Sequence, residues 1–527
     1  MSMTSSPAIG NATAPQKLLF DCSEWDFTTV QRTYEAIEDI ALNDLGLNIY
    51  PNQIEIISSE QMLDAYCSVG MPLMYSHWSF GKRFAREETL YRKGFQGLAY
   101  EIVINSNPCI SFYMEENTMP MQTLVLAHAA FGHNHFFKNN YLFNEWTDAN
   151  AILGYLEFAK AYVAECEERH GPETVEAVLD AAHALMDQSV FRSRRPAKLN
   201  MLERERRRDE RRSHDEQSFN DLWRTLPASR AAHEPTASDV DLAERKKKLG
   251  LPEENLLYFI EKNSPVLEPW QREVLRIVRN TAQYFYPQRQ TKLMNEGCAT
   301  FVHHYITNRL YDDGLIDEGA LLEILHSHSN VVSQPDFDDR RYSSINPYAL
   351  GFAMMQDIKR ICSSPTEEDR DWFPDIAGNA DWRGTLKHVW ANYRDESFVR
   401  QFLSPKIIRE FKLFVLSDEP GAAKMRVNAI HDEEGYRKVR SALADSYDVS
   451  LQDPDIQIVD VDLRGDRELV LRHGVRNGAR LAEKECSQVL EHLRQLWGYG
   501  VRMEGADVET GSTVYSVKAE GGKSLVG

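Results

Sequence analysis

The sequence predicts an α+β fold, in which a large, mostly helical N-terminal domain with a small hairpin or sheet precedes a smaller C-terminal α+β domain. Two patterns predict this fold. Apolar residues recur at helical spacing through most of the N-terminal region, interrupted by two β-rich runs. After Phe411 the pattern becomes strand, strand, helix, strand, strand, helix, which is typical of a small α+β domain. A length of 527 residues also exceeds what one hydrophobic core normally spans.

The composition of successive segments sets the predicted domain boundaries. Residues 1–17 are a Ser/Thr/Ala-rich leader without the basic and apolar regions of a signal peptide, so we expect them to be disordered. The N-terminal domain is expected at 18–410, with a charged, partly disordered insertion at 192–250 that contains the run ERERRRDERRSHDE. The C-terminal domain is expected at 411–503, and a Gly/Ser/Glu-rich, disordered tail at 504–527.

The first elements are a helix and a hairpin. Apolar residues at steps of three and four between Trp25 and Leu45 predict the helix, and Ser23 with Asp26 predicts its capping box. The runs YEIVI and CISFYM flank the turn-forming residues Asn-Ser-Asn-Pro, which predicts the hairpin. Further helices are predicted at 121–137, which is long, apolar and therefore buried, and at 148–169, at 172–186 and within 253–309.

The C-terminal domain is predicted from four short apolar runs and two helical segments. The runs KLFVLSD, KMRVNAI, DIQIVDVD and ELVLRH are typical of strands. Residues 434–447 and 478–496 have the spacing of helices.

Composition excludes several classes of function. The net charge of -20 argues against nucleic-acid binding and against adhesion to an anionic membrane, because both need an excess of Lys and Arg. The seven cysteines are scattered without a C-x-x-C pair, which indicates reduced thiols. No apolar run approaches the roughly 20 residues that span a bilayer, and no glycine-rich nucleotide motif occurs. We therefore expect a cytoplasmic protein without membrane insertion.

Histidine and glutamate residues cluster in two apolar segments. The first cluster contains Glu115, Glu116, His128, His133 and His135, and the second contains Glu296, His303 and His304. An apolar helix keeps such groups only when something pairs with them, because an unpaired buried polar group costs about 1–3 kcal/mol. Three interpretations stay open at this point: the side chains bind a metal, they form a hydrogen-bond network that fixes helix register, or they carry out chemistry without a metal. His77, His183 and His328 stand apart from both clusters.

Several long motifs carry a family resemblance. They are YSHWSFGKRF, AH..FGHN.FFKNN, NDLWRTLP, NLLYFIEKN, LEPWQREVLRIVR, QYFYPQRQ, NEG.ATF.HH and NPYALGFAMMQDIKR. In this order they resemble the SpoVR family, from about Phe20 to past Gly500. The resemblance implies a role in sporulation and spore cortex formation, or in stress and stationary-phase physiology. It also implies two partners, a PrkA-type serine kinase and a von Willebrand A-domain protein. The alternative function is then a non-catalytic adaptor for these partners.

A second resemblance concerns the histidines. Zinc peptidases carry H-E-x-x-H, because a spacing of four leaves two histidine ligands about 40° apart on one helix face. The segment that begins with Asn295 and Glu296, NEGCAT, is similar to the third-ligand helix of gluzincin aminopeptidases. The first cluster departs from that pattern, because Ala129 replaces the catalytic glutamate and the histidines are five residues apart. In a regular α-helix, side chains five residues apart point about 140° away from each other. A π-bulge or a break at Gly132 is therefore needed to align the two histidines.

These residues define the predicted site. The metal ligands are expected to be His128, His133, Glu296 and His303, with zinc as the metal. Glu116 is expected to act as the general base, with Glu115 beside it as an alternative. His135 and His304 are treated as neighbours. The enzyme interpretation is thus a metal-dependent hydrolase with a gluzincin-like pocket.

Overall fold

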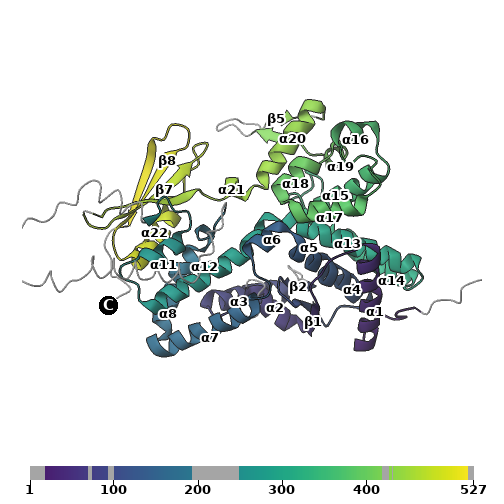
Figure 1. The fold of residues 1–527 in the computed structure, drawn as a ribbon, viewed down its shortest axis with the longest axis horizontal. Coiled ribbons are helices and arrows are strands. Elements are labelled where there is room, and N and C mark those ends of the chain that lie inside the picture. The colour runs from purple at the N-terminus through teal and green to yellow at the C-terminus, as the bar shows by residue number, and fades with distance from the viewer. Residues whose placement is uncertain are drawn as a thin grey trace, which may run out of the picture. The chain divides into compact units, whose positions relative to one another are not determined.

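The computed structural model describes residues 18–68, 74–92, 100–192, 249–417, 426–429, 431–463 and 465–519. The chain forms two compact units, each made of two stretches of sequence. The first unit comprises Met1–Pro172 and Tyr284–Asp453, and the second comprises Glu173–Gln283 and Pro454–Gly527. Helices dominate, and small sheets accompany them in both units, so the predicted α+β class is confirmed (Figure 1).

The first unit opens with a helix and a three-stranded sheet. Helix α1 (Phe27–Asp39) begins at Asp26, which forms a capping box with Thr29 in place of the predicted Ser23, and it continues as the π-helical η1 (Ile40–Asp44). The elements that follow are β1 (Asn52–Ile57), α2 (Ser59–Cys67), α3 (Trp78–Arg92), β2 (Glu101–Ile104) and β3 (Cys109–Met114). Strand β3 lies in the middle of the sheet, parallel to β1 and antiparallel to β2. The predicted hairpin is therefore β2–β3.

A helical layer completes the first unit. Its first part contains α4 (Met119–Val125), η2 (Leu126–His133), α5 (Asn134–Asn139), α6 (Tyr141–Trp146) and α7 (Ile152–His170). Its second part contains α13 (Lys292–Asp312), α14 (Glu318–Val331), α15 (Pro347–Ser363), α16 (Glu367–Trp372), α17 (Trp382–Asn392), α18 (Asp395–Phe402) and α19 (Pro405–Glu410). After these come β4 (Val415–Ser417), β5 (Arg426–Ala429), α20 (Glu433–Ser446) and α21 (Val449–Gln452). The core of this unit is built largely from η2, α13 and α15, whose apolar side chains are buried.

The second unit combines helices with a four-stranded sheet. Its helical elements are α8 (Pro172–Ala184), η3 (Met186–Gln188), α11 (Leu256–Asn263), α22 (Glu483–Trp497) and α12 (Pro269–Gln290), which belongs to this unit up to Gln283. Its strands are β6 (Ile456–Val461), β7 (Leu469–Val475), β8 (Val501–Asp507) and β9 (Thr513–Ala519), in the order β6-β7-β8-β9.

The C-terminal region differs from its prediction in two ways. The predicted order of strands and helices is present as β4, β5, α20, β6, β7 and α22, but the first three belong to the first unit, so the units divide after Asp453 and not before Phe411. The tail predicted to be disordered from Glu504 instead contains the end of β8 and all of β9. One glycine of this tail, Gly505, has a packing role, because a Cβ there would overlap the ring of Tyr515 on the neighbouring strand. The leader and nearly all of the charged insertion lie outside the described residues.

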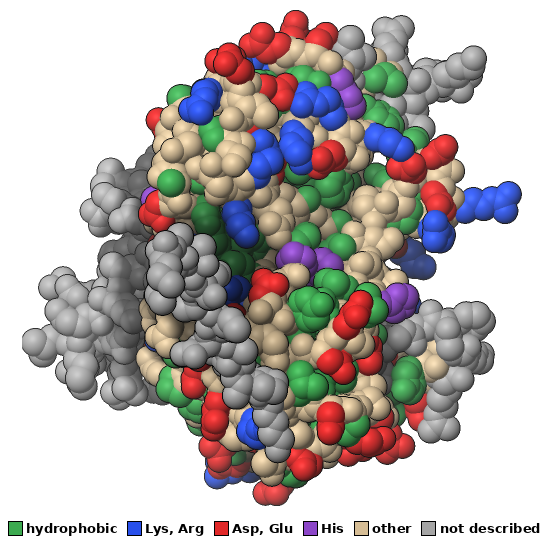
Figure 2. All heavy atoms as spheres, turned by 90° about the vertical axis from the view of Figure 1, so that its right-hand side faces the viewer, with side chains coloured by type: hydrophobic (Ala, Val, Ile, Leu, Met, Phe, Trp, Pro, Cys, Tyr) green, Lys and Arg blue, Asp and Glu red, His purple; other side chains and the backbone are tan. Residues whose placement is uncertain are grey.

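The surface agrees with the acidic composition. Figure 2 shows Asp and Glu side chains over the described surface, densely at the lower edge of the view, with Lys and Arg among them nearer the top. The cysteines, all of which lie in described segments, carry free thiols. Within the described segments, none of the helices has the length and hydropathy needed to cross a bilayer.

Candidate metal centre

The two histidines of the first cluster lie on a π-helix. The segment η2 is wound as a π-helix between α4 and α5, and all eight of its residues are buried. A π-helical hydrogen bond joins residues five apart, so His128 and His133 lie one above the other, with ring centroids 4.7 Å apart. The π-helical winding that the five-residue spacing of His128 and His133 requires is therefore present. Gly132 lets this helix touch α13, since a Cβ there would lie 2.5 Å from the Cα of Ala299.

Helix α13 carries the second cluster and is fixed at its N-terminus. The carboxylate of Asp395 accepts hydrogen bonds from the backbone N–H groups of Leu293 and Met294, at 2.8 and 2.9 Å. Burial raises the pKa of Asp395 to about 8, against the lowering effect of these two N–H groups. A few residues on, Gly297 meets Gly351 of α15, where a Cβ would lie 2.7 Å from the facing backbone. These contacts set the position of the following turn, which carries Asn295 and Glu296.

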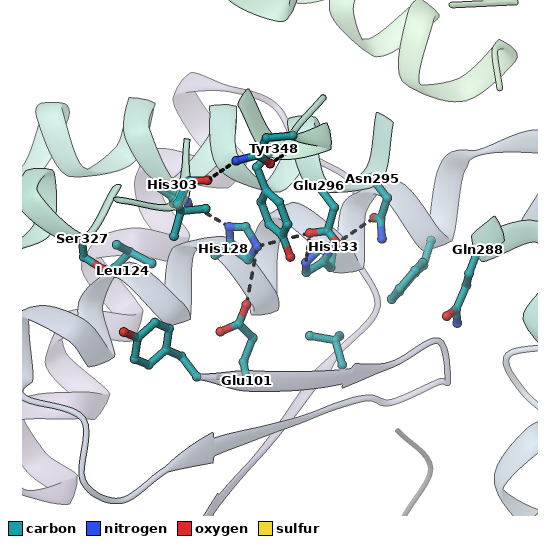
Figure 3. Close-up of a pocket in the computed structure, with 15 residues that line it drawn as sticks. Glu101, Leu124, His128, His133, Gln288, Asn295, Glu296, His303, Ser327 and Tyr348 are labelled. Atoms are coloured by element: carbon teal, nitrogen blue, oxygen red, sulfur yellow. Dashed lines mark hydrogen bonds and ion pairs between the residues drawn. The ribbon is translucent and has the colours of Figure 1, made fainter. Parts of the chain in front are cut away.

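Four side chains converge between η2, α13 and β2 (Figure 3). The Nε2 atom of His128 lies 3.6 Å from Glu101 Oε1 and 4.0 Å from Glu296 Oε2, and His133 Nε2 lies 3.6 Å from Glu296 Oε2. Ligand atoms of Glu101, His128 and His133 all lie within 4.8 Å of one another. Tetrahedral ligands at about 2.1 Å from zinc are about 3.4 Å apart, so a small adjustment would bring this group onto one ion. Within the described residues, Glu101, His128 and His133 form the one group of this size that could hold a metal ion.

Hydrogen bonds at the far side of each ring orient the two histidines. His133 Nδ1 lies 2.9 Å from Asn295 Oδ1, an oxygen that only accepts, so Nδ1 carries the proton and Nε2 turns a lone pair to the centre. His128 Nδ1 lies 2.9 Å from His303 Nδ1, which leaves Nε2 of His128 facing the two glutamates. Outer partners of this kind orient the imidazole ligands of metal sites.

The structure places His303 behind the centre and not at it. Its Nδ1 contacts His128, and its Nε2 lies 2.9 Å from His328 Nδ1, so both ring nitrogens already have partners. Glu101 of β2, and not His303, lies next to His128 and His133. Strand alternation turns Glu101 and Val103 to the same face, towards the cavity. A single glutamate inside the apolar run YEIVI was the available signal, and the sequence reasoning missed it.

The remaining predicted residues lie away from the centre. Glu115 and Glu116 are exposed, and Glu116 Oε1 accepts a hydrogen bond from the N–H of Ser59 at 3.3 Å. After Met114 the chain leaves the sheet and turns to start α4. Both glutamates lie in this turn, outside the set of residues that line the cavity. The Nδ1 atom of His135 bonds to the backbone N–H of Asn48 at 2.9 Å. The rings of His304 and His328 pack together.

The electrostatics of the site favour a cation. Burial, and then the charge of Glu296, raise the pKa of Glu101 to about 8. Burial and the neighbouring histidines hold the pKa values of His128 and His303 well below 6.5. The buried Oε2 of Glu296 has no hydrogen-bond partner. Two carboxyl groups thus share a site with imidazoles, and the described side chains that line the cavity include no Lys or Arg.

The centre opens into a cavity of about 600 Å³. Tyr348 enters it from the first turn of α15, where Asn346 caps the helix and Pro347 occupies the first position. Burial, followed by the charges of Glu296 and Glu101 and a hydrogen bond to Glu296, raises the pKa of the Tyr348 hydroxyl. The Asn-Pro helix start was visible in the sequence, but nothing in the sequence connected it to Glu296.

Comparisons with known proteins agree with the motifs. The family model described as SpoVR like protein matches residues 24–452, and the SpoVR-like C-terminal domain matches residues 454–508. The chain is 54% identical over 486 residues to the uncharacterized protein YcgB of Escherichia coli (strain K12), covering 92% of this chain and 93% of that protein. No solved structure matches the chain. Two adjoining family models thus cover nearly the whole sequence, and the chain belongs to the SpoVR family.

Proposed function

We propose that the chain is a metal-dependent hydrolase with zinc held by Glu101, His128 and His133. The observation that carries the proposal is the convergence of these three side chains, each offering a ligand atom within 4.8 Å of the others. Two histidines and one carboxylate, with a fourth position left open, are the ligand set of many catalytic zinc sites. The fixed tautomer of His133 supports the same assignment, because the nitrogen that faces the centre is the one able to bind a metal.

Glu296 is the general base of the proposal. Its Oε2 has no hydrogen-bond partner among the described residues and lies within 4.0 Å of both Nε2 atoms, so it would lie beside a metal held by the two histidines. Tyr348 bonds to the same carboxylate and orients it. A bound zinc ion would lower the pKa of a water molecule and polarise a carbonyl group. Glu296 would accept the proton of the attacking water and pass it to the leaving group. Glu116, being exposed and outside the cavity, has no part in this scheme.

The first test is the zinc content of protein purified without a histidine tag. We expect about one zinc per chain in the wild type, and loss of zinc in His128→Ala and in His133→Ala, because each removes a ligand. His135→Ala is the matched control, since it is a buried histidine of the next helix that lies outside the centre, and it should keep zinc. Wild-type protein that takes up no zinc, or a His128→Ala variant that binds it equally well, would contradict the proposal.

The second test separates the enzyme from the adaptor. Glu296→Gln should keep zinc and lose activity in cells, because an amide preserves shape but does not accept the proton. An adaptor for a PrkA-type kinase and a von Willebrand A-domain protein does not need this carboxylate. A Glu296→Gln strain with normal zinc content and a wild-type phenotype would therefore favour the adaptor role.

A further inference from the structure

Strand β2 has one paired edge and one free edge. It lies at the side of the sheet β1-β3-β2, and the N–H of Met114 donates to the C=O of Tyr100 at 3.4 Å. In an antiparallel ladder the bonded residues alternate, so Ile102 and Ile104 also turn their backbone groups to β3. The N–H and C=O groups of Glu101 and Val103 therefore point to the opposite edge. No hydrogen bond from the described part of the chain reaches them there.

The strand that carries this free edge also lines the cavity that contains the candidate metal centre. Glu101 and Val103 line the cavity together with His128 and His133. Figure 3 shows β2 running beneath the centre, with Leu124 and Ser327 on one side of His128 and Gln288 on the other. Lining residues thus lie on both sides of the centre along the direction of the strand. In a ligand lying along β2, the middle of the ligand and not its end would lie at the metal.

The lining indicates the chemistry of that ligand. Apart from Glu101 and Glu296, the lining residues that the structure describes carry no carboxyl, ammonium or guanidinium group. They are the apolar Val103, Leu124, Phe137 and Val331, the amides Gln288, Asn295 and Asn346, and the hydroxyl groups of Tyr100, Tyr348 and Ser327, together with the histidines. No Lys or Arg among them offers a partner for a phosphate or a carboxylate. The cavity therefore suits a neutral ligand with amide groups, and its volume of about 600 Å³ suits a short segment.

We infer that the substrate is an extended polypeptide segment that pairs as an added strand with the free edge of β2. The inference rests on the proposed hydrolase. Main-chain bonds to Glu101 and Val103 would hold the segment, and the apolar wall would receive alternate side chains. The peptide carbonyl carbon opposite Glu101 then lies at the centre. The water oxygen, with its remaining proton, would bond to this carbon, the C–N bond would break, and the proton taken by Glu296 would go to the leaving amine, which gives one carboxylic acid and one amine.

Hydroxamates test the inference on the zinc-loaded, full-length protein. Acetohydroxamate contacts the metal alone, whereas N-acetyl-Leu-Ala-Leu hydroxamate adds main-chain amides. By calorimetry we expect the peptide to bind at least about tenfold more tightly than acetohydroxamate. The same peptide with N-methylated amides should lose that gain, because it no longer donates to the strand edge. Equal affinities for the peptide and its methylated form would overturn the inference while the metal site stands. Absence of zinc would instead refute the proposed function.

A pair of variants at one position separates the main chain from the side chain. Val103→Pro removes an N–H that points away from β3, a change that edge strands accommodate. Val103→Ala changes the side chain and keeps the N–H. The ratio of peptide to acetohydroxamate affinity should fall about tenfold in the proline variant and by clearly less in the alanine variant, which loses only part of the apolar wall. An equal fall in both would assign recognition to the side chain and contradict strand pairing. If the proline variant does not fold, the methylated peptide still decides the question.

Discussion

Both units of the molecule bury carboxylates, but they surround them differently. In the second unit, Glu261 is 1% exposed and is paired with Lys262 at 2.5 Å and with Arg276 at 2.8 Å. Its Oε2, which has no hydrogen bond, lies 3.2 Å from Arg279. In the first unit, Glu101 and Glu296 are 20% and 17% exposed and share a cavity whose described lining includes no Lys or Arg.

The difference lies in the charges that surround the two carboxyl groups. Burial alone would raise the pKa of Glu261, but Arg279, Lys262 and Arg276 outweigh it and the net effect is a lowered pKa. Burial raises the pKa of Glu101, and the nearest charge, Glu296, raises it further. A protein that folds around an unneutralised pair of carboxyl groups gains most from a cation that comes from outside. The comparison thus supports a metal at the first site and predicts none at the second.

The largest expected effect is the loss of stability on substitution of Glu261. Glu261→Gln leaves three cations without their buried partner, so we expect it to destabilise the protein by about 3–5 kcal/mol in urea unfolding, with zinc content unchanged. Glu273→Gln is the matched control, because Glu273 also pairs with Arg276 but is less buried, with 23% of its side chain exposed, and it should lose at most about 1 kcal/mol. Equal losses in the two variants would show that burial of Glu261 adds nothing.

The pH dependence of that difference has a defined sign. Since the pKa of Glu261 is lowered on folding, its contribution is fully present above its unfolded value of about 4.3. It disappears as the pH falls through the folded pKa. The stability gap between wild type and Glu261→Gln should therefore be constant above pH 5 and shrink below pH 4. A gap that grows on acidification would contradict the ion-pair account.

Zinc should stabilise the first unit by a smaller, adjustable amount. At a free zinc concentration about one hundred times its dissociation constant, binding adds about 2.7 kcal/mol to the free energy of unfolding. We expect the corresponding rise in melting temperature in the wild type and in Glu261→Gln, and no rise in His128→Ala. A zinc-dependent rise that survives in His128→Ala would place the ion elsewhere.

The partner of His128 should matter less than His128 itself. His303→Phe keeps the ring volume but removes the nitrogen that orients His128, so zinc affinity should fall about 10- to 100-fold. His304→Phe is the matched control on the same helix, and titration with a competing chelator measures both variants. An affinity in His303→Phe equal to that of the control would show that the histidine contact has no orienting role.

The smallest effect is expected at Glu116. Because its carboxylate is exposed and, among the described residues, bonds only to the backbone of Ser59, Glu116→Gln should change stability by less than about 0.5 kcal/mol and leave zinc content unchanged. Loss of cellular activity in this variant, with normal zinc, would restore Glu116 as a functional residue.

The sequence predicted those features that depend on local pattern. The β2–β3 hairpin, the buried helical segment around His128 and the strand and helix order near the C-terminus all follow from apolar spacing. The condition for aligning His128 with His133 also followed, because for a given helical winding the angle between two residues is set by how far apart they are. The approach of Glu296 to these histidines was expected from the motif of α13.

Features that depend on long-range contacts were not predictable in this way. Glu101 joins the site because β2 lies beside η2, and no spacing within the strand encodes that neighbour. His303 was taken as a ligand because it shares a face with Glu296, but His328 of α14 engages its second nitrogen. The end of the chain was misjudged from its glycine content, since Gly505 makes room for the ring of Tyr515 on β9.

The π-helical winding of η2 also bears on how such centres are recognised in other sequences. A π-turn is equivalent to an α-helix that carries one inserted residue. Removing one residue between His128 and His133 would return the segment to α-helical winding and leave the histidines four apart, which again aligns them. Two motifs of different length, H-x-x-x-x-H and H-x-x-x-H, therefore specify the same arrangement in space. A search that fixes the spacing at four would pass over this chain, although its histidines face one another.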